Sequence, residues 1–225
     1  MAPEKRKKEL LKGLPVSEGI AIGEVLVLES PWDEVSDYHI TEDDVEREVA
    51  RYEQALASVD RQLHECRVRV ENEIGEEEAG IFDSHISILE DHFFRKDIPD
   101  GIIHEQLNAE GVLKERVEVW LKQLNKVTKN DHLKQRGDDV RDVAVRLLRV
   151  LLQTDVDPTS LEKPHLLVSA SLTPSDTARF KRENVLGFAT ELGGKTSHAS
   201  ILARSLGLPA VVGIDRLTRN VYTGD

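Results

Sequence analysis

The chain has 225 residues, of which 39% are hydrophobic and 32% charged, so it has room for two domains with buried cores. A formal net charge of −12 argues against a nucleic-acid-binding surface and suits a basic or neutral partner. The single cysteine excludes an intramolecular disulfide, and no apolar run reaches the roughly 20 residues of a membrane span, so we expect a cytoplasmic protein without a signal peptide.

The first 28 residues divide into a basic tail and a strand-forming segment. Residues 1–12 are basic and polar, which is typical of a solvated, frayed terminus, with an anchor to an anionic surface as the alternative. Residues 13–28 are rich in Val, Ile, Leu and Gly, and this composition predicts one or two β-strands.

From Thr41 onward the apolar residues recur at alternating intervals of four and three residues, which predicts a long amphipathic helix. Thr41 and Asp44 stand three residues apart at its start and match a capping box. The apolar positions are Val45, Val49, Tyr52, Leu56, Val59, Leu63, Cys66 and Val70. A coiled-coil dimer would explain this seam, but further helical stretches follow directly, so an intramolecular bundle is the better interpretation.

Three more helices are predicted after Gly75 interrupts this pattern. We expect them over residues 76–94, 109–125 and 138–152. The turn Pro99-Asp100-Gly101 and the polar stretch 126–135 are expected to separate them. Four helices of this kind predict a closed bundle.

The last third of the chain returns to alternating strands and helices. Residues 165–170 and 184–189 are expected to form strands. Between them, Thr173 is a predicted N-cap, Pro174 occupies the first helical position and Asp176 completes a capping box. The sequence therefore predicts a sheet built from both ends of the chain, with the helical bundle inserted between them.

Residues 193–213 form the most informative stretch, GGKTSHASILARSLGLPAVVG. The paired glycines permit a tight turn, and a helix is expected to begin at His198 or just before it and to stop at Gly207. Its predicted buried face consists of Ala199, Leu202, Ala203 and Leu206. This arrangement leaves Ser200 and Arg204 outside, and a short strand is predicted over 208–212.

His198 is the residue in this stretch that could carry chemistry. A histidine at a helix start lies where unpaired backbone N–H groups and the positive end of the helix dipole meet, which favours a bound phosphate group. An unperturbed imidazole is largely neutral near pH 7 and can attack as a nucleophile. From the residues alone, a helix-capping histidine beside a glycine turn is the alternative.

The same stretch resembles the phosphohistidine signature of the PEP-utilising enzymes, most closely that of Enzyme I of the bacterial phosphoenolpyruvate:sugar phosphotransferase system. Related dikinases and PEP synthases share a similar GG-x-T-[SC]-H core, so the signature alone indicates the superfamily. Four further segments resemble Enzyme I in the same order, namely residues 15–23, 81–91, 139–143 and 172–177.

The resemblance implies an α/β swivelling phosphohistidine domain with an inserted all-α helical bundle. We place the first domain over residues 1–34 plus 153–225 and the second, an HPr-binding bundle, over 35–152. Enzyme I continues with further strands and a PEP-binding barrel, so the chain resembles a fragment of such a protein.

The function that the resemblance implies is phosphotransferase activity in sugar transport, with a phosphoryl group passing from PEP through His198 to the phosphocarrier HPr. No cofactor is expected in this part, and Mg²⁺ is expected in the absent PEP-binding domain. Without that domain, the 225-residue chain is not expected to use PEP. We expect it to be a monomer and the full-length protein to be a homodimer.

The site residues are carried over position by position. His198 is the implied phosphohistidine, and the turn that receives the phosphoryl group consists of Gly194, Lys195, Thr196 and Ser197. Lys195 stands where the family usually has arginine, which loses bidentate geometry and keeps the charge. Thr177 matches a threonine beside the active histidine, and an ordinary helix residue is an equal alternative for it.

In the bundle, the positions that face HPr in the family are matched by Glu76, Glu77, His85, Ile88, Leu89 and Arg136. Simple burial is the alternative for the apolar residues, and a solvated face for the charged ones. Ser87, His92 and Phe93 differ from the family's commoner residues at this surface. Two other functions stay open, a dikinase-type swivelling domain and a non-catalytic regulatory homologue.

Overall fold

The computed structural model describes residues 10–127, 131–154, 163–177, 183–195 and 197–225. The chain divides into two compact units, which we describe separately. The sheet unit consists of Met1–Glu29, Pro158–Leu172 and Phe180–Asp225, and the helical unit of Ser30–Asp157 and Thr173–Arg179. These bounds differ from the predicted domain bounds by a few residues where the chain passes from one unit to the other. The segment Thr173–Arg179 belongs to the helical unit rather than to the predicted α/β domain. The division into two domains itself stays a prediction.

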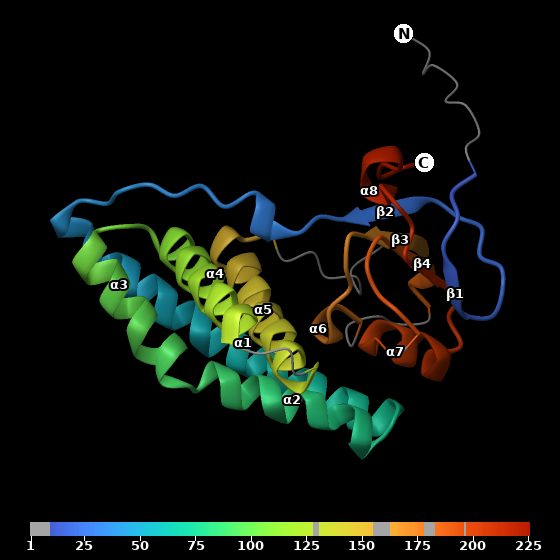
Figure 1. Cartoon of the computed structure of the whole chain (residues 1–225), viewed down its shortest axis with the longest axis horizontal. Helices are drawn as coiled ribbons and strands as arrows, with labels where there is room; N and C mark the ends of the chain where they lie inside the picture. The colour runs from blue at the N-terminus through green and yellow to red at the C-terminus, as the bar shows by residue number, and fades with distance from the viewer. Residues whose placement is uncertain (1–9, 128–130, 155–162, 178–182, 196) are drawn as a thin grey trace, which may run out of the picture. The chain divides into compact units, whose positions relative to one another are not determined.

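The sheet unit is organised around one five-stranded sheet with the order β1-β5-β4-β3-β2 (Figure 1). Its strands are β1 (Leu14–Ser17), β2 (Val25–Leu28), β3 (His165–Ser169), β4 (Val185–Thr190) and β5 (Ala210–Val212). β1 pairs antiparallel with β5, and the other neighbours are parallel. The two strands from the N-terminal segment thus form the two edges of a sheet whose centre comes from the C-terminal segment, which confirms the prediction that both ends of the chain build it.

Two helices, α7 (His198–Leu206) and α8 (Leu217–Asn220), accompany the sheet. The predicted start at His198 is confirmed, and α7 stops at Gly207, whose φ of 62° is in the left-handed region. α7 buries Ala199 and Ala203 in a core that includes Leu167, Phe188 and Val212. The backbone of the last residues pairs with β2, because Gly224 N–H donates to Val25 C=O at 2.9 Å.

The helical unit contains α1 (Val45–Glu73), α2 (Glu76–Leu89), α3 (Ile98–Glu105), α4 (Ala109–Val127), α5 (Asp131–Leu152) and α6 (Pro174–Thr177). Shorter turns are η1 (Pro31–Asp33), η2 (Glu42–Asp44) and the π-helical η3 (Phe93–Asp97). α1 packs against α2, α3 and α5, and its seam from Tyr52 to Val70 is buried in one core (Figure 1). This packing confirms the intramolecular bundle. Among the described residues, no helix is long and apolar enough to cross a membrane.

The predicted capping box at Thr41 is wrong. The Thr41 hydroxyl donates to the Asp44 carboxylate at 2.8 Å, and neither side chain caps a backbone N–H. Because the two side chains satisfy each other, the first turn closes instead through the backbone, with Asp44 N–H donating to Thr41 C=O at 3.0 Å. This short-range bond is the 3₁₀ turn η2 that precedes α1.

The predicted turn Pro99-Asp100-Gly101 is also wrong, because these residues form the first turn of α3. Proline is tolerated there, since the first N–H groups of a helix lack intrahelical partners. Gly101 is buried, and a Cβ at this position would stand 2.7 Å from Val112 Cγ1. The glycine therefore allows α3 and α4 to approach closely rather than ending a helix.

The described residues of the polar stretch 126–135, which was predicted to separate two helices, are helical. α4 continues to Val127 and α5 begins at Asp131, seven residues before the predicted start at 138. Lys, Gln and Arg are good helix formers, so polarity alone does not end a helix.

Candidate functional site

The glycine turn before α7 lies at the carboxyl end of the central parallel strands. β4 ends at Thr190, and the next residues return to β3, where Leu192 N–H donates to Ala170 C=O at 2.9 Å. Gly193 then adopts a φ of 121°, a conformation that L-residues with a Cβ rarely adopt. Loops at this edge of a parallel sheet are common ligand-binding positions.

Ser197 is the N-cap of α7, which agrees with the predicted helix start at His198. Its backbone is extended, with φ −66° and ψ 150°, and its hydroxyl accepts from Ser200 N–H at 3.3 Å. The turn is closed by Ser197 N–H, which donates to Gly194 C=O at 3.1 Å.

The prediction that Ser200 lies on the outer face of α7 is wrong. The residue is 0% exposed, and its hydroxyl donates to Gly194 C=O at 2.7 Å and lies 2.9 Å from Ser197 Oγ. The side chain is buried because the turn folds back over the first helical residues. Ser200 thus fastens Gly194 to the helix, and its separation of three residues from the N-cap was the signal that could have indicated this role.

Arg204 also supports the turn. Its guanidinium donates to Lys195 C=O at 3.0 Å and to Val16 C=O at 3.4 Å, so it connects α7 with the turn and with β1. Lys195 itself is exposed, and the first turn of α7 carries no acidic residue. The surroundings of the helix start are therefore cationic and suit an anion.

His198 is the first residue of α7, so its backbone lies at the positive end of the helix. Its side chain and all of Thr196 lie outside the described residues. Their implied roles, as phosphohistidine and as part of the receiving turn, stay predictions.

Thr177 belongs to α6 in the helical unit, whereas His198 belongs to the sheet unit. Thr177 is 1% exposed, and its hydroxyl donates to Thr173 C=O at 3.1 Å and to Pro174 C=O at 3.0 Å. Bonds of this kind to the preceding turn fix the side-chain rotamer. The role beside the histidine that the resemblance implies stays a prediction.

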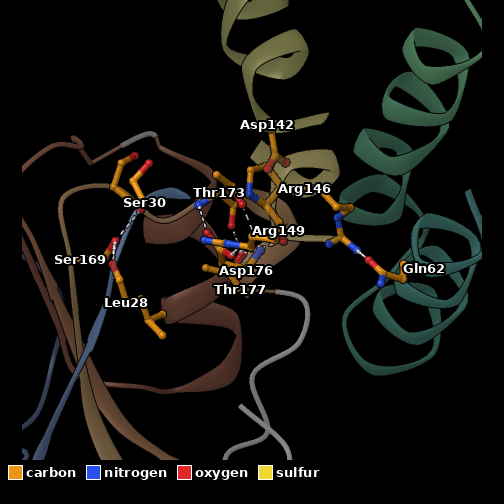
Figure 2. A network of polar contacts seen from close by, with 12 residues as sticks. Leu28, Ser30, Gln62, Asp142, Arg146, Arg149, Ser169, Thr173, Asp176 and Thr177 are labelled. Atoms are coloured by element: carbon orange, nitrogen blue, oxygen red, sulfur yellow. Dashed lines mark hydrogen bonds and ion pairs between the residues drawn. The ribbon is translucent and has the colours of Figure 1, made fainter. Parts of the chain in front are cut away.

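The capping box of α6 is confirmed, since Asp176 N–H donates to Thr173 Oγ1 at 3.1 Å and Thr173 N–H to Asp176 Oδ2 at 3.1 Å. Arg149 of α5 also contacts Asp176 through an ion pair (Figure 2). Burial acts to raise the pKa of Asp176, but the charge and hydrogen bond of Arg149 and the bonds to Thr173 outweigh it and hold this pKa below its ordinary value. α6 is thereby fixed to the end of α5.

The residues expected to face a carrier fall into two groups. Glu76 and Glu77 are exposed in the acidic first turn of α2, and Arg136 is exposed on α5. His85, Ile88 and Leu89 are 0%, 6% and 0% exposed, so in this structure they pack inside the helical unit and do not form its surface. Of the positions that differ from the family, Ser87 and His92 are exposed and Phe93 is half-buried.

One open cavity of about 350 Å³ lies elsewhere in the helical unit and is lined by Phe93, Asp97, Asp100, Gly101, His104 and Arg116. Within the described part of the chain, no group of three or more His, Cys, Asp or Glu residues could hold a metal ion.

Comparison with known families agrees with this architecture. The model described as PEP-utilising enzyme, N-terminal, matches residues 12–136, and the one described as PEP-utilising enzyme, mobile domain, matches residues 161–225. The first alone covers more than half of the chain, and the chain therefore belongs to the PEP-utilising enzymes.

Individual relatives indicate a narrower class of enzyme within this family. The phosphoenolpyruvate-protein phosphotransferase of Haemophilus influenzae is 38% identical over 217 residues, and that of Enterococcus faecalis 35% over 218 residues. Each match covers 96% of this chain and 38% of the relative, so the chain spans well under half the length of the curated relatives it matches.

Two solved structures share the fold. An NMR solution structure of Enzyme I is 34% identical, with a TM-score of 0.73 over 96% of this chain and 87% of that one. The N-terminal domain of Enzyme 1 - Nitrogen, 24% identical with a TM-score of 0.69 over 95% of this chain and 87% of that one, supports the fold alone. The predicted fold class, an α/β part with an inserted helical bundle, and the resemblance to Enzyme I are confirmed.

Proposed function

We propose that the chain is the phosphohistidine-bearing and carrier-docking part of a phosphoenolpyruvate-protein phosphotransferase. The observation that carries this proposal is the closed turn at Gly194, fastened by Ser197 and Ser200, directly before His198 at the start of α7. The relatives that match along 96% of the chain carry this enzyme's name, which supports it over a dikinase-type swivelling domain.

In the proposed reaction, a neutral His198 imidazole attacks phosphorus in line with the leaving group. The new P–N bond forms as the P–O bond to the enol of PEP breaks, and the phosphoryl group then passes to a histidine of an HPr-type carrier as the same P–N bond breaks. Backbone N–H groups at the helix start and the charge of Lys195 balance the equatorial oxygens. Thr177 is proposed to orient the unphosphorylated ring.

The proposed steps in this part use no metal ion. Mg²⁺ is proposed to act in the PEP-binding part of the full-length protein, where it would offset the charge of the PEP phosphate. The full-length protein is proposed to be a cytoplasmic homodimer and the 225-residue chain a monomer.

The carrier is proposed to dock on the helical unit. The acidic first turn of α2, with Glu76 and Glu77 exposed, suits a basic partner, and Arg136 on α5 is proposed as a further contact. The exposed charges would mainly raise the association rate and would be screened by salt.

The test is labelling of the 225-residue chain by carrier phosphorylated with ³²P. Phosphoryl transfer runs through the same transition state in both directions, so the chain should take up an acid-labile, alkali-stable label. His198→Ala should abolish the label, and His64→Ala, a change at an exposed histidine of α1, should keep it. PEP with Mg²⁺ should not label this chain.

Labelling that survives in His198→Ala would overturn the proposed nucleophile. A folded chain that takes no label from the phosphorylated carrier would instead favour a non-catalytic regulatory homologue.

A further inference from the structure

The core of the helical unit contains a buried polar cluster that the proposed function does not use. His85 of α2 is 0% exposed, and its ring lies between two carboxylates of α5. Nε2 is 3.6 Å from Asp139 Oδ1, and Nδ1 is 3.4 Å from Asp142 Oδ2. Neither ring nitrogen has a hydrogen-bond partner within the described part of the chain. Because buried polar groups are normally paired, this arrangement requires a chemical explanation.

The remaining neighbours come from all three helices around the ring. Asp142 is 3% and Arg146 4% exposed, and neither carboxylate oxygen of Asp142 has a hydrogen-bond partner among the described residues. Arg146 donates to Gln62 Oε1 of α1 at 3.1 Å (Figure 2) and lies 3.8 Å from Cys66 Sγ. On α2, Phe82 meets the imidazole edge to face at 6.0 Å. α1 thus contributes an amide and a thiol to the cluster, and α5 contributes two carboxylates and a guanidinium.

The number of N–H groups that the two carboxylates require indicates the charge of the His85 ring. A neutral imidazole has one N–H group, so it can donate to one carboxylate while its second nitrogen presents a lone pair to the other. An imidazolium has two N–H groups, one for each carboxylate. With a neutral ring, the cluster holds two carboxylates and one guanidinium, which itself contacts Gln62 and Cys66, so one negative charge is left uncompensated. With a charged ring the cluster is balanced, and burial of an uncompensated charge is avoided.

We propose that His85 is a doubly protonated bridge between Asp139 and Asp142, which fixes α2 on α5 and so positions the acidic first turn of α2 for the carrier. α2 is one continuous helix from Glu76 to Leu89, so an anchor at His85 constrains Glu76 and Glu77 at its other end. His85 is a positioning residue. The positioning of Glu76 and Glu77 for the carrier rests on the proposed function, whereas the bridge between His85 and the two carboxylates does not.

The first test measures the ring in the unmodified chain by NMR of nitrogen-15-labelled histidine. At pH 7 both ring nitrogens of His85 should carry protons, and the signals of the exposed His64 and His92 side chains serve as the reference in the same spectrum. A single neutral tautomer of His85 at pH 7 would overturn the bridge. This measurement needs no variant and stands even if every substitution at the cluster impairs folding.

The second test is a double-variant cycle read by urea unfolding. His85→Gln and Asp142→Asn should each destabilise the chain, because each unbalances the cluster. Combined, they remove one charge of each sign and leave one carboxylate, Asp139, and one guanidinium, Arg146, in the cluster, so the double variant should be more stable than the sum of the single losses predicts. Additive losses would contradict a charged bridge. His64→Gln, at an exposed position of α1, is the matched control and should leave unfolding unchanged.

The third test addresses positioning. In His85→Gln, amide hydrogen exchange in α2 should speed up, and the KM for an HPr-type carrier should rise about tenfold, with the effect in KM rather than kcat. Reversal of Glu76 and Glu77 to lysine is measured in parallel. If that reversal leaves carrier binding unchanged, the docking part of the proposed function fails while the bridge stands on the first two tests. If the reversal weakens binding and a folded His85→Gln does not, the positioning role is overturned.

Discussion

Ser200 shows how one small side chain can decide the geometry of the turn. Its hydroxyl is the atom through which the first turn of α7 holds Gly194, and it is completely buried. The sequence could predict the N-cap Ser197 and the stop at Gly207, because both follow from local backbone rules. Ser200 had a local signal, its place three residues after the N-cap, but its bond to Gly194 arises only when the loop folds back on the helix. The contacts of Arg204 with Lys195 and Val16 had no local signal, because they require the folded turn and β1 in the sheet.

Ser200→Ala should therefore destabilise the chain by about 1–3 kcal/mol, because the Gly194 carbonyl loses its donor in a buried position. It should also slow uptake of the phosphoryl group from the carrier, since the turn before His198 loosens. Urea unfolding and the rate of labelling measure the two effects. Ser205→Ala, at an exposed serine of the same helix, is the control; equal losses in the two variants would contradict the role of Ser200.

At the scale of elements, periodicity predicted the long helices well and their breaks poorly. The seam of α1 was visible because its apolar residues recur at helical spacing, whereas α3 was missed because proline and glycine were interpreted as a turn. The structure shows that Gly101 serves packing against Val112. Whether such a glycine ends a helix or allows close packing depends on the neighbouring helix, and a local sequence pattern carries no information about that neighbour.

Two glycines in helices allow a matched comparison. Gly101→Ala should cost about 1–3 kcal/mol, because a Cβ would stand 2.7 Å from Val112 Cγ1 and α3 would have to move. Gly80→Ala in α2 should instead stabilise by up to about 1 kcal/mol, since that position faces open space and alanine is the better helix former. Thermal unfolding of both variants checks the opposite signs. A loss of stability for Gly80→Ala as large as that for Gly101→Ala would show that the packing of α3 on α4 is not the cause.

The attachment of α6 to α5 should depend on pH. The folded-state pKa of Asp176 lies below its unfolded value of about 3.8, so its ion pair with Arg149 contributes its full stabilisation above 3.8 and loses it as pH falls from there through the lower folded-state pKa. Asp176→Asn should therefore destabilise at pH 7 by about 3–5 kcal/mol and show less further loss toward pH 3 than the unmodified chain.

Unfolding in urea at pH 7, 5, 4 and 3 measures this difference. Asp215→Asn is the control, since that carboxylate is 92% exposed and should change neither the stability nor its pH dependence. An Asp176→Asn chain that retains the full acid sensitivity of the unmodified protein would contradict the assignment.

At the scale of the whole molecule, the sheet could be predicted as a composite because strand-like segments flank a long helical region. The fold class followed from that pattern and from the resemblance together. The assignment of Thr173–Arg179 to the helical unit could not, since it depends on the contact between Arg149 and Asp176, residues 27 positions apart.

Because both ends of the chain build the sheet, the helical part and the C-terminal part should differ in their ability to fold alone. A polypeptide of residues 30–157 should fold alone into a cooperative helical structure, because it retains α1 to α5 and their common core. A polypeptide of residues 158–225 should not, since β3 and β5 would lose their partners β2 and β1. Circular dichroism during thermal unfolding tests both; a cooperative transition in the second polypeptide would contradict the structural need for β1 and β2.

The same strand arrangement has a consequence for synthesis on the ribosome. β2 ends at Leu28 and its partner β3 begins at His165. At a translation rate of about 5–20 residues per second, β1 and β2 therefore stay without a partner strand for on the order of ten seconds. During that interval helices α1 to α5 emerge in one continuous run and can bury their common seam. The nascent chain therefore carries folded helices after an early pair of unpaired strands and before the central strands whose sheet they eventually border. Those two strands are the part of the protein most exposed to mispairing before translation ends.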